Sequence, residues 1–196
     1  VRSLLERGAL NDLFDVVALG RPELDLTDPE EIDVALRQAQ PDVIVSAAAY
    51  TAVDRAETEI EEAHAINAIA PGWIAASAAR LDVPIIHLST DYVFDGEKTE
   101  PYLETDAVGA RSVYGRTKLA GEQAVAEAAD NHVILRTAWI YSPFGRNFLK
   151  TMLLLSERRD QVDVVNDQIG NPTSALDVAE GILAIADNLL TERGSH

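Results

Sequence analysis

The amino-acid sequence predicts an α/β domain in which a parallel β-sheet carries helices on both faces, the doubly wound arrangement. Three observations indicate this fold. Short runs of β-branched and other apolar residues alternate with helical stretches along the chain. The helical stretches are long enough to connect parallel strands. Polar residues that could carry chemistry follow directly after several strands, at the sheet edge where such folds bind ligands.

The first half of the chain alternates helix and strand from its first residue. The expected elements are a helix over 1–8, a strand over 14–19, a helix over 28–39, a strand over 42–45 and an alanine-rich helix over 57–80. Asp28 is expected to cap the second helix, with Pro29 in its first turn and Pro41 beyond its end. We expect the Pro71-Gly72 pair to break the alanine-rich helix.

The second half continues the alternation around one long loop. The expected elements are a strand over 83–88, a loop over 96–113, a helix over 114–129, a strand over 133–135, a helix over 146–158, a strand over 162–165 and an amphipathic helix over 174–190. Chemistry-bearing residues then fall at strand ends: the 47–50 segment follows one strand, Ser89-Thr90 ends the next, and Trp139 lies just beyond another.

Composition narrows the classes of function. The chain has 196 residues, 47% hydrophobic and 25% charged, which fits one packed domain. A net charge of −17 argues against non-specific binding to nucleic acid and against docking on an anionic membrane. No apolar run has the length of a membrane span. There are no cysteines and the four histidines are scattered, so we predict no metal site.

Tyr114 and Lys118 form the most informative pair in the sequence. Four residues apart on a helix, their side chains share one face. A phenol is protonated at neutral pH, and a neighbouring cation stabilises its ionised form, so the pair could exchange a proton with a substrate oxygen. Together with Ser89-Thr90 after an apolar run, this pair suggests a carbonyl reductase or alcohol dehydrogenase that uses a nicotinamide.

One expected signal is missing. A Rossmann-type dinucleotide-binding domain begins with a strand and a glycine-rich turn over the pyrophosphate. The sequence contains no G-x-G-x-x-G, and its first residues already have a helical pattern. We therefore expect that the first strand and the phosphate loop have been lost from this sequence, by truncation or by omission of disordered residues.

Six motifs in order carry a resemblance to a known family. They are Pro41–Asp54, Ser89–Gly96, Tyr114–Glu122, Arg136–Tyr141, Gly145–Phe148 and Asp167–Thr173. A lone Y-x-x-x-K is weak evidence, but six motifs over nearly the whole chain are strong. The sequence resembles the extended short-chain dehydrogenase/reductases, and within them the dTDP-4-dehydrorhamnose reductase family. It departs from that family in lacking the glycine-rich turn and in stopping before the second lobe.

The resemblance implies a role for each candidate catalytic residue. Tyr114 would protonate the C4 oxygen of a sugar ketone as hydride arrives. Lys118 would lower the pKa of that tyrosine and bind the nicotinamide ribose. Thr90 would orient the carbonyl, although capping of the next turn is an equally familiar use of a threonine. Asp91 and Trp139 would line the sugar pocket, while Asp91 could instead be an N-cap.

The cofactor side of the site is also implied by the resemblance. Its residues are Arg21, Asp25, Leu26, Ala48, Ala49, Tyr50, Tyr114 and Lys118. Arginine at position 21 stands where an NAD enzyme would carry an acid for the adenosine ribose, so NADPH is favoured over NADH. The alanines after the strand would let the cofactor approach the backbone, but tight helix–sheet packing needs small residues as well.

The resemblance therefore implies a reductase that transfers hydride from NAD(P)H to the C4 ketone of dTDP-4-dehydro-6-deoxy-L-mannose and yields dTDP-L-rhamnose. It also implies a cytoplasmic enzyme and a homodimer. The whole chain would be one NAD(P)-binding domain with the start of a substrate lobe at about 139–173, and this fragment need not be active by itself. A non-catalytic regulatory subunit of the same fold, or another nucleotide-sugar epimerase or dehydratase, stays open as an alternative.

Overall fold

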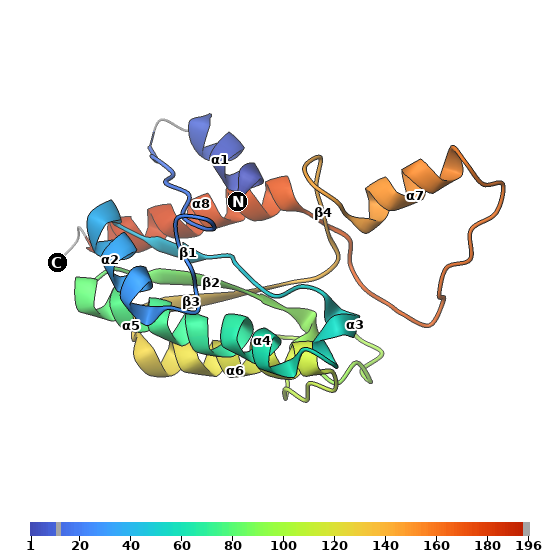
Figure 1. Ribbon diagram of the computed structural model, residues 1–196, viewed down its shortest axis with the longest axis horizontal. Coiled ribbons are helices and arrows are strands. Elements are labelled where there is room, and N and C mark those ends of the chain that lie inside the picture. The colour runs from blue at the N-terminus through green and yellow to red at the C-terminus, as the bar shows by residue number, and fades with distance from the viewer. Residues whose placement is uncertain (11–12, 194–196) are drawn as a thin grey trace. The chain divides into compact units, whose positions relative to one another are not determined.

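The computed structural model describes residues 1–10 and 13–193, which form two compact units (Figure 1). The larger unit contains 19–136 and the end of the chain from Leu189. The smaller unit contains 1–18 and 137–188. Each unit is described by itself below.

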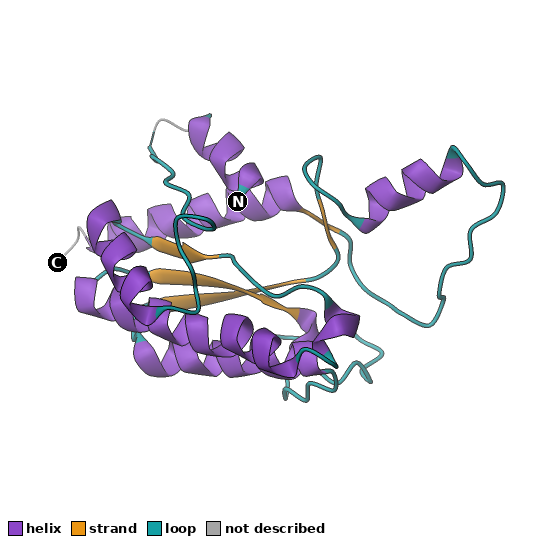
Figure 2. Cartoon of the chain, viewed as in Figure 1, coloured by secondary structure: helices purple, strands orange, loops and turns teal. Residues whose placement is uncertain are grey.

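A three-stranded sheet is the centre of the larger unit (Figure 2). Its strands are β1 (Ile44–Ser46), β2 (Ile85–Thr90) and β3 (His132–Thr137), in the order β1-β2-β3. Strands β1 and β2 are parallel, and their register places Ser46 beside His87. The three strands predicted here are confirmed, with ends shifted by at most two residues.

Helices of the larger unit follow the predicted pattern closely. They are α2 (Pro29–Ala39), α3 (Val53–Ala56), α4 (Ile60–His64), the π-helix η1 (Ala65–Ile69), α5 (Ala70–Leu81), the 3-10 turn η2 (Asp91–Val93) and α6 (Val113–Ala128). The predicted cap of α2 is confirmed, because the Asp28 carboxylate accepts hydrogen bonds from the backbone N–H groups of Glu30 at 2.8 Å and Glu31 at 3.1 Å.

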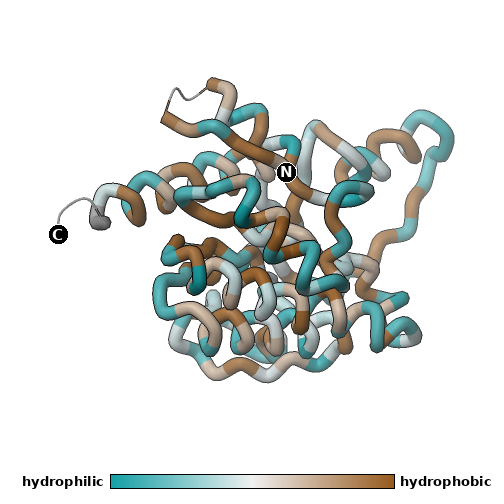
Figure 3. Tube along the Cα trace, turned by 60° about the vertical axis from the view of Figure 1, so that its left-hand side comes forward, coloured by the Kyte–Doolittle hydropathy of each residue, from teal (hydrophilic) through white to brown (hydrophobic). Residues whose placement is uncertain are grey.

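The core of this unit lies between the sheet and helices α2, α5 and α6. Hydrophobic and hydrophilic residues take turns along the helices in Figure 3, as expected where one face is buried. The buried residues of the main cluster are Leu24, Ile32, Leu36, Ile44, Ile74, Ala75, Ala78, Ile85, Val125 and Ala129. A smaller cluster of Ala56, Ala63 and Val113 packs against Tyr50 and Tyr114, so part of the hydrophobic core supports the predicted site.

The predicted break at Pro71-Gly72 is wrong, because the helical path runs on from α4 to α5. Pro71 falls in the first turn of α5, directly after a π-helix. The residues just before it are wound as a π-helix, in which the N–H of Ala70 bonds to the carbonyl of Ala65. The chain thus accommodates the proline by widening one turn instead of ending the helix.

The smaller unit pairs two short strands that the sequence did not indicate. Its elements are α1 (Arg2–Ala9), β4 (Ile140–Tyr141), α7 (Phe148–Ser156), β5 (Thr173–Ser174) and most of α8 (Ala175–Arg193). Strands β4 and β5 are parallel, with Ile140 beside Thr173. The helices predicted over 1–8, 146–158 and 174–190 are confirmed.

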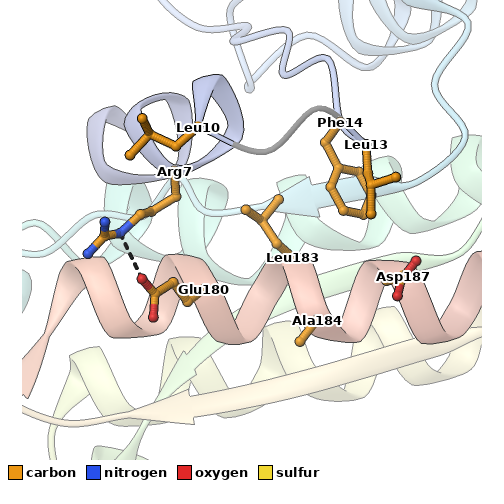
Figure 4. A pocket seen from close by; sticks show the side chains of 8 residues that line it. All are labelled: Arg7, Leu10, Leu13, Phe14, Glu180, Leu183, Ala184 and Asp187. Carbon is orange, nitrogen blue, oxygen red and sulfur yellow. Dashed lines mark ion pairs between the residues drawn. The ribbon is translucent and has the colours of Figure 1, made fainter.

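A pocket in this unit lies between α1, the segment after it and α8 (Figure 4). An ion pair between Arg7 and Glu180, 3.0 Å from Nε to Oε1, lies at one end of it. The lining residues are Arg7, Leu10, Leu13, Phe14, Glu180, Leu183, Ala184 and Asp187. None of them is among the predicted site residues.

Two predicted strands are wrong. Segments 14–19 and 162–165 are rich in valine and other apolar residues, yet in the described part of the chain neither forms a ladder. Val17 is 62% exposed and Val165 is 68% exposed. High β-propensity reports how well a side chain fits a paired, half-buried surface, and these segments lack that surface.

Candidate active site

Tyr114 lies in the first turn of α6, and two side chains from outside the helix hold that turn in place. The Ser112 hydroxyl accepts a hydrogen bond from the N–H of Gly115 at 3.0 Å. The Glu57 carboxylate accepts one from the N–H of Val113 at 2.7 Å. These acceptors satisfy N–H groups that a helix start leaves unpaired, so the backbone that carries Tyr114 is well anchored.

Helix α6 touches the end of β2 through Gly115. A Cβ atom at this position would lie 2.3 Å from the carbonyl oxygen of Tyr92, which is closer than any side chain allows. This contact brings the Tyr114 ring against Tyr92, edge to face, with centroids 5.5 Å apart. It also brings the Tyr114 phenol close enough to Thr90 for that side chain to influence the pKa of the phenol. The glycine inside the Y-x-x-x-K motif thus assembles the predicted catalytic pair Tyr114 and Thr90.

Burial raises the pKa of the Tyr114 phenol above its ordinary value of 10.0. The side chain of Thr90 opposes this shift, and the nearby groups Asp91 and Tyr92 add to it. The net shift is upward, opposite to the lowering expected from Lys118 alone, because desolvation penalises the charged phenolate more than its surroundings stabilise it. Tyr114 therefore stays protonated at neutral pH, which suits a group that gives up a proton.

Lys118 lies one turn further along α6 and is only 2% exposed. Its ammonium group donates to the carbonyl oxygen of Leu88 at 2.7 Å, so it reaches β2 just before Ser89-Thr90. Burial lowers the pKa of Lys118 from 10.5 to about 8, although the charge of Glu122 acts in the opposite direction. Tyr114 and Lys118 thus face the same end of the same strand, as their spacing predicted.

An ion pair that the sequence did not reveal, between buried Glu122 and partly buried Arg136, lies next to Lys118 along α6. Glu122, 4% exposed, accepts two hydrogen bonds from Arg136 at 2.9 and 2.7 Å. The guanidinium of Arg136 also lies 5.0 Å above the ring of Phe94. Both charges are matched by a partner with good geometry, which is what makes their burial tolerable. The pair ties α6 to β3.

Replacing Lys118 by methionine is expected to stabilise the folded protein at pH 7 by about 1–2 kcal/mol. The depressed pKa of Lys118 means that burying its charge costs about 3 kcal/mol of stability, which methionine avoids. Methionine also loses the hydrogen bond to the Leu88 carbonyl, which lowers stability by about 1–2 kcal/mol. Between pH 8 and pH 10.5 the unfolded chain binds more protons than the folded one, so wild-type stability rises with pH and the difference shrinks.

Urea denaturation of both proteins at pH 7 and near pH 10 measures this change. Lys150→Met is the matched control, since Lys150 is half-buried in α7 and its ammonium donates to the carbonyl of Pro143. It should change stability by no more than about 0.5 kcal/mol. Equal destabilisation by Lys118→Met at both pH values would contradict the interpretation.

Thr90 ends β2 and is 6% exposed. Its hydroxyl accepts a hydrogen bond from the N–H of Tyr92 at 3.3 Å and donates to the carboxylate of Asp91 at 3.0 Å. The capping role is therefore present, and Thr90 rather than Asp91 is the N-cap of η2. Burial raises the pKa of Asp91. To bind a substrate carbonyl, the Thr90 hydrogen has to turn away from Asp91.

The segment after β1 is held by an asparagine of the π-helix. Asn67, fully buried, accepts a hydrogen bond from the N–H of Tyr50 at 2.8 Å and donates to its carbonyl at 3.1 Å. It also donates to Thr117 of α6 at 3.2 Å. An asparagine is unfavourable in the middle of a helix, and this one joins the β1 loop to the Tyr114 helix. Ala48 is exposed at this loop and Ala49 is half-buried.

The residues predicted for the adenosine end lie in the segment before α2. Arg21 is 71% exposed and lies 3.9 Å from Asp25. Asp25 accepts hydrogen bonds from the N–H and hydroxyl of Thr27, at 2.9 and 2.8 Å. Leu26 packs against the main core. Arg21 therefore keeps an accessible guanidinium, whereas Leu26 is partly committed to packing.

Trp139 belongs to the smaller unit. It is 45% exposed, and its backbone φ of 45° marks a sharp turn before β4. Its ring lies on the backbone of Gly170, where a Cβ would be 2.6 Å from the indole. The Gly170 contact gives Trp139 a structural role, and its role at the sugar stays a prediction.

In the same unit the Asn147 side chain caps α7 by accepting a hydrogen bond from the N–H of Lys150 at 3.0 Å.

Comparison with known proteins places this geometry in a family. The family model described as RmlD substrate binding domain matches residues 2–195. The chain belongs to this family. A dTDP-4-dehydrorhamnose reductase from Sinorhizobium fredii is 52% identical over 177 residues, which is 90% of this chain and 60% of the relative. Among the solved structures, the dTDP-4-dehydrorhamnose reductase of Bacillus anthracis in complex with NADP has a TM-score of 0.90 at 35% identity, covering 95% of this chain and 66% of that one.

A third relative shows how the family varies. A probable dTDP-4,6-dihydroxy-2-methyloxan-3-one 4-ketoreductase of Streptomyces antibioticus is 45% identical over 185 residues, which is 94% of this chain and 62% of the relative. The chain thus spans about 60% of the length of these curated relatives. Its membership confirms the predicted family and the Rossmann-like α/β fold.

The described residues contain neither a membrane-spanning helix nor a metal-binding cluster. No helix among them is both long and apolar enough to cross a membrane. Within the same residues, no group of three histidine, aspartate or glutamate side chains is placed to hold a metal ion.

Proposed function

We propose that this chain is the catalytic core of an NAD(P)H-dependent reductase that acts on the C4 ketone of dTDP-4-dehydro-6-deoxy-L-mannose and forms dTDP-L-rhamnose. The observation that carries the proposal is a protonated phenol, Tyr114, beside Thr90 at the carboxyl end of a parallel strand, with the buried ammonium of Lys118 one turn away. Similarity to dTDP-4-dehydrorhamnose reductases supports the substrate.

The residues around Lys118 fit a nicotinamide ribose. An ammonium has three donors, and the contacts with Leu88 and His87 account for two of them. The third can donate to a ribose hydroxyl. Ala48, exposed after β1, presents little bulk to a ligand at the sheet edge. When bound, the nicotinamide supplies the hydride. The exposed guanidinium of Arg21 would suit a 2′-phosphate, which favours NADPH, and the structure of the Bacillus anthracis relative holds NADP.

Residues of this chain would then stabilise the negative charge that develops on the ketone oxygen. The Thr90 hydroxyl and the Tyr114 phenol would both donate hydrogen bonds to the ketone oxygen. Tyr114 gives its proton to that oxygen as negative charge develops. The Lys118 ammonium stabilises the tyrosinate that is left. Asp91 and Trp139 are proposed to contact the sugar, and residues 139–173 to begin the substrate lobe. We also propose a homodimer in the cytoplasm.

A spectrophotometric assay of the full-length protein with NADPH and the 4-keto sugar nucleotide tests the proposal. We expect net NADPH oxidation, and a higher kcat/KM for NADPH than for NADH. Cofactor binding without turnover would instead support a regulatory binding subunit. Conversion of the sugar without net oxidation of the cofactor would support an epimerase or a dehydratase.

A further inference from the structure

His87 is a fully buried histidine in the middle of β2, between Ile86 and Leu88. Its Nδ1 lies 3.1 Å from the hydroxyl of Ser46, its neighbour across the β1–β2 ladder. Its Nε2 lies 3.4 Å from the ammonium of Lys118. The imidazole therefore forms a bridge from β1 to the helix that carries the predicted catalytic residues.

The donors and acceptors of this bridge determine one tautomer. A lysine ammonium can only donate, so the Nε2 atom that faces it must carry a lone pair. The ring hydrogen then sits on Nδ1 and is donated to the Ser46 hydroxyl. Burial, and next the charge of Lys118, lower the pKa of His87 to about 3. The ring thus stays neutral across the range in which proteins work.

From this geometry we propose that His87 is a positioning residue that holds the Lys118 ammonium in place and in its charged form. The inference rests on the proposed function, in which that ammonium binds the ribose and stabilises the tyrosinate. Two acceptors on consecutive residues, the Leu88 carbonyl and the His87 ring, receive hydrogens from the same nitrogen. The flexible lysine side chain is thereby limited to one geometry, with its remaining donor free for a ligand.

Other titratable groups around Lys118 also affect its charge, and the contribution of His87 is judged beside theirs. On α6, Tyr114 precedes it by one turn and Glu122 follows it by one turn. The Glu122 charge favours the ammonium but is shared with Arg136 of β3. From η2, Asp91 faces Tyr114 and burial keeps its pKa raised. Because burial works against the ammonium, a neutral acceptor at His87 extends the pH range over which it keeps its charge.

Two substitutions at position 87 separate the two ends of the bridge. His87→Asn can replace the donor to Ser46 but cannot reach Lys118. His87→Gln can present an oxygen near the Nε2 position and so retains the acceptor for Lys118. A hydrogen bond to a charged group is worth about 1.5–3 kcal/mol, and one pKa unit is about 1.4 kcal/mol. In the full-length protein, His87→Asn should move the basic limb of the kcat/KM profile about one pH unit lower.

In the same assay the basic limb of the kcat/KM profile of His87→Gln should lie within about half a pH unit of the wild-type limb. His132→Asn is the matched control, because this histidine begins β3 and contacts the Ala129 carbonyl. The pH profile of kcat/KM for this variant should match that of wild type. If both position-87 variants shift the limb equally, or neither does, the proposal is overturned. Tm measurements on each variant identify any that fail to fold.

A measurement on wild type needs neither variants nor activity. Long-range ¹H–¹⁵N NMR of the full-length protein should show His87 neutral, with its hydrogen on Nδ1, from about pH 6 to pH 7, where Lys118 is charged. A hydrogen on Nε2 would refute the bridge even if the enzyme is active. Conversely, the protein could show the expected tautomer and yet lack reductase activity. That result would support the Ser46–His87–Lys118 geometry and would reject only the proposed function.

Discussion

Tyr114→Phe is expected to lower kcat of the full-length protein by roughly 10²–10⁴-fold, the usual contribution of a positioned acid. The substitution removes only the hydroxyl, so the ring can keep its edge-to-face contact with Tyr92. KM for the sugar should change little, because the lost interaction develops with charge on the ketone oxygen and not in the ground state. Steady-state kinetics with NADPH measure both parameters.

Tyr102→Phe makes the same chemical change outside the site. The Tyr102 hydroxyl donates to Asp95 at 2.6 Å and its ring stacks on Phe94, so the variant controls for loss of a structural hydrogen bond. Its kcat should stay within about twofold of wild type. A Tyr114→Phe protein with unaltered kcat, or with a raised KM alone, would remove Tyr114 from the chemistry.

Gly121→Ala is expected to destabilise the protein by about 2–3 kcal/mol, a large effect for one methyl group. A Cβ at this position would lie 2.1 Å from the carbonyl oxygen of Asn67 and 3.2 Å from its carbonyl carbon. Both are backbone atoms, so α6 and the π-helix must separate. That movement would stretch the Asn67–Thr117 hydrogen bond and carry Tyr114 and Lys118 with it.

Gly181→Ala is the control for helix propensity. Gly181 lies in α8, and a Cβ there would meet nothing within 4 Å. Alanine should therefore stabilise this helix by about 0.5–1 kcal/mol. Chemical denaturation of the two variants beside wild type measures both effects. Equal and favourable changes at the two positions would show that the close approach of α6 to Asn67 is not rigid.

The sequence predicted most of the secondary structure because its signals act over a few residues. The Asp28 cap with Pro29 and the spacing of Tyr114 and Lys118 are local features, and both are found as expected. The strands predicted over 14–19 and 162–165 failed for the opposite reason. A strand needs a partner, and apolar β-branched residues do not supply one.

The same distinction between local and long-range features applies to the site residues. Motifs identified Tyr114, Lys118 and Thr90, but not the buried partners that give them their properties. His87 and Ser46 are separated by 41 residues, and Glu122 and Arg136 by 14, so their pairing appears only when strands and helix pack together. A histidine inside an otherwise apolar strand was the one available signal, since a buried polar side chain requires a partner.

By itself the sequence determined the family, the alternation of helices and strands, and which phenol and amine stand one turn apart. These properties depend on residue order and on short spacing along one helix. Only the tertiary structure decided that burial raises the pKa of Tyr114 and lowers the pKa of Lys118 to about 8. A pKa depends on how completely water is removed and on which dipoles and charges replace it, and those neighbours come from distant parts of the chain.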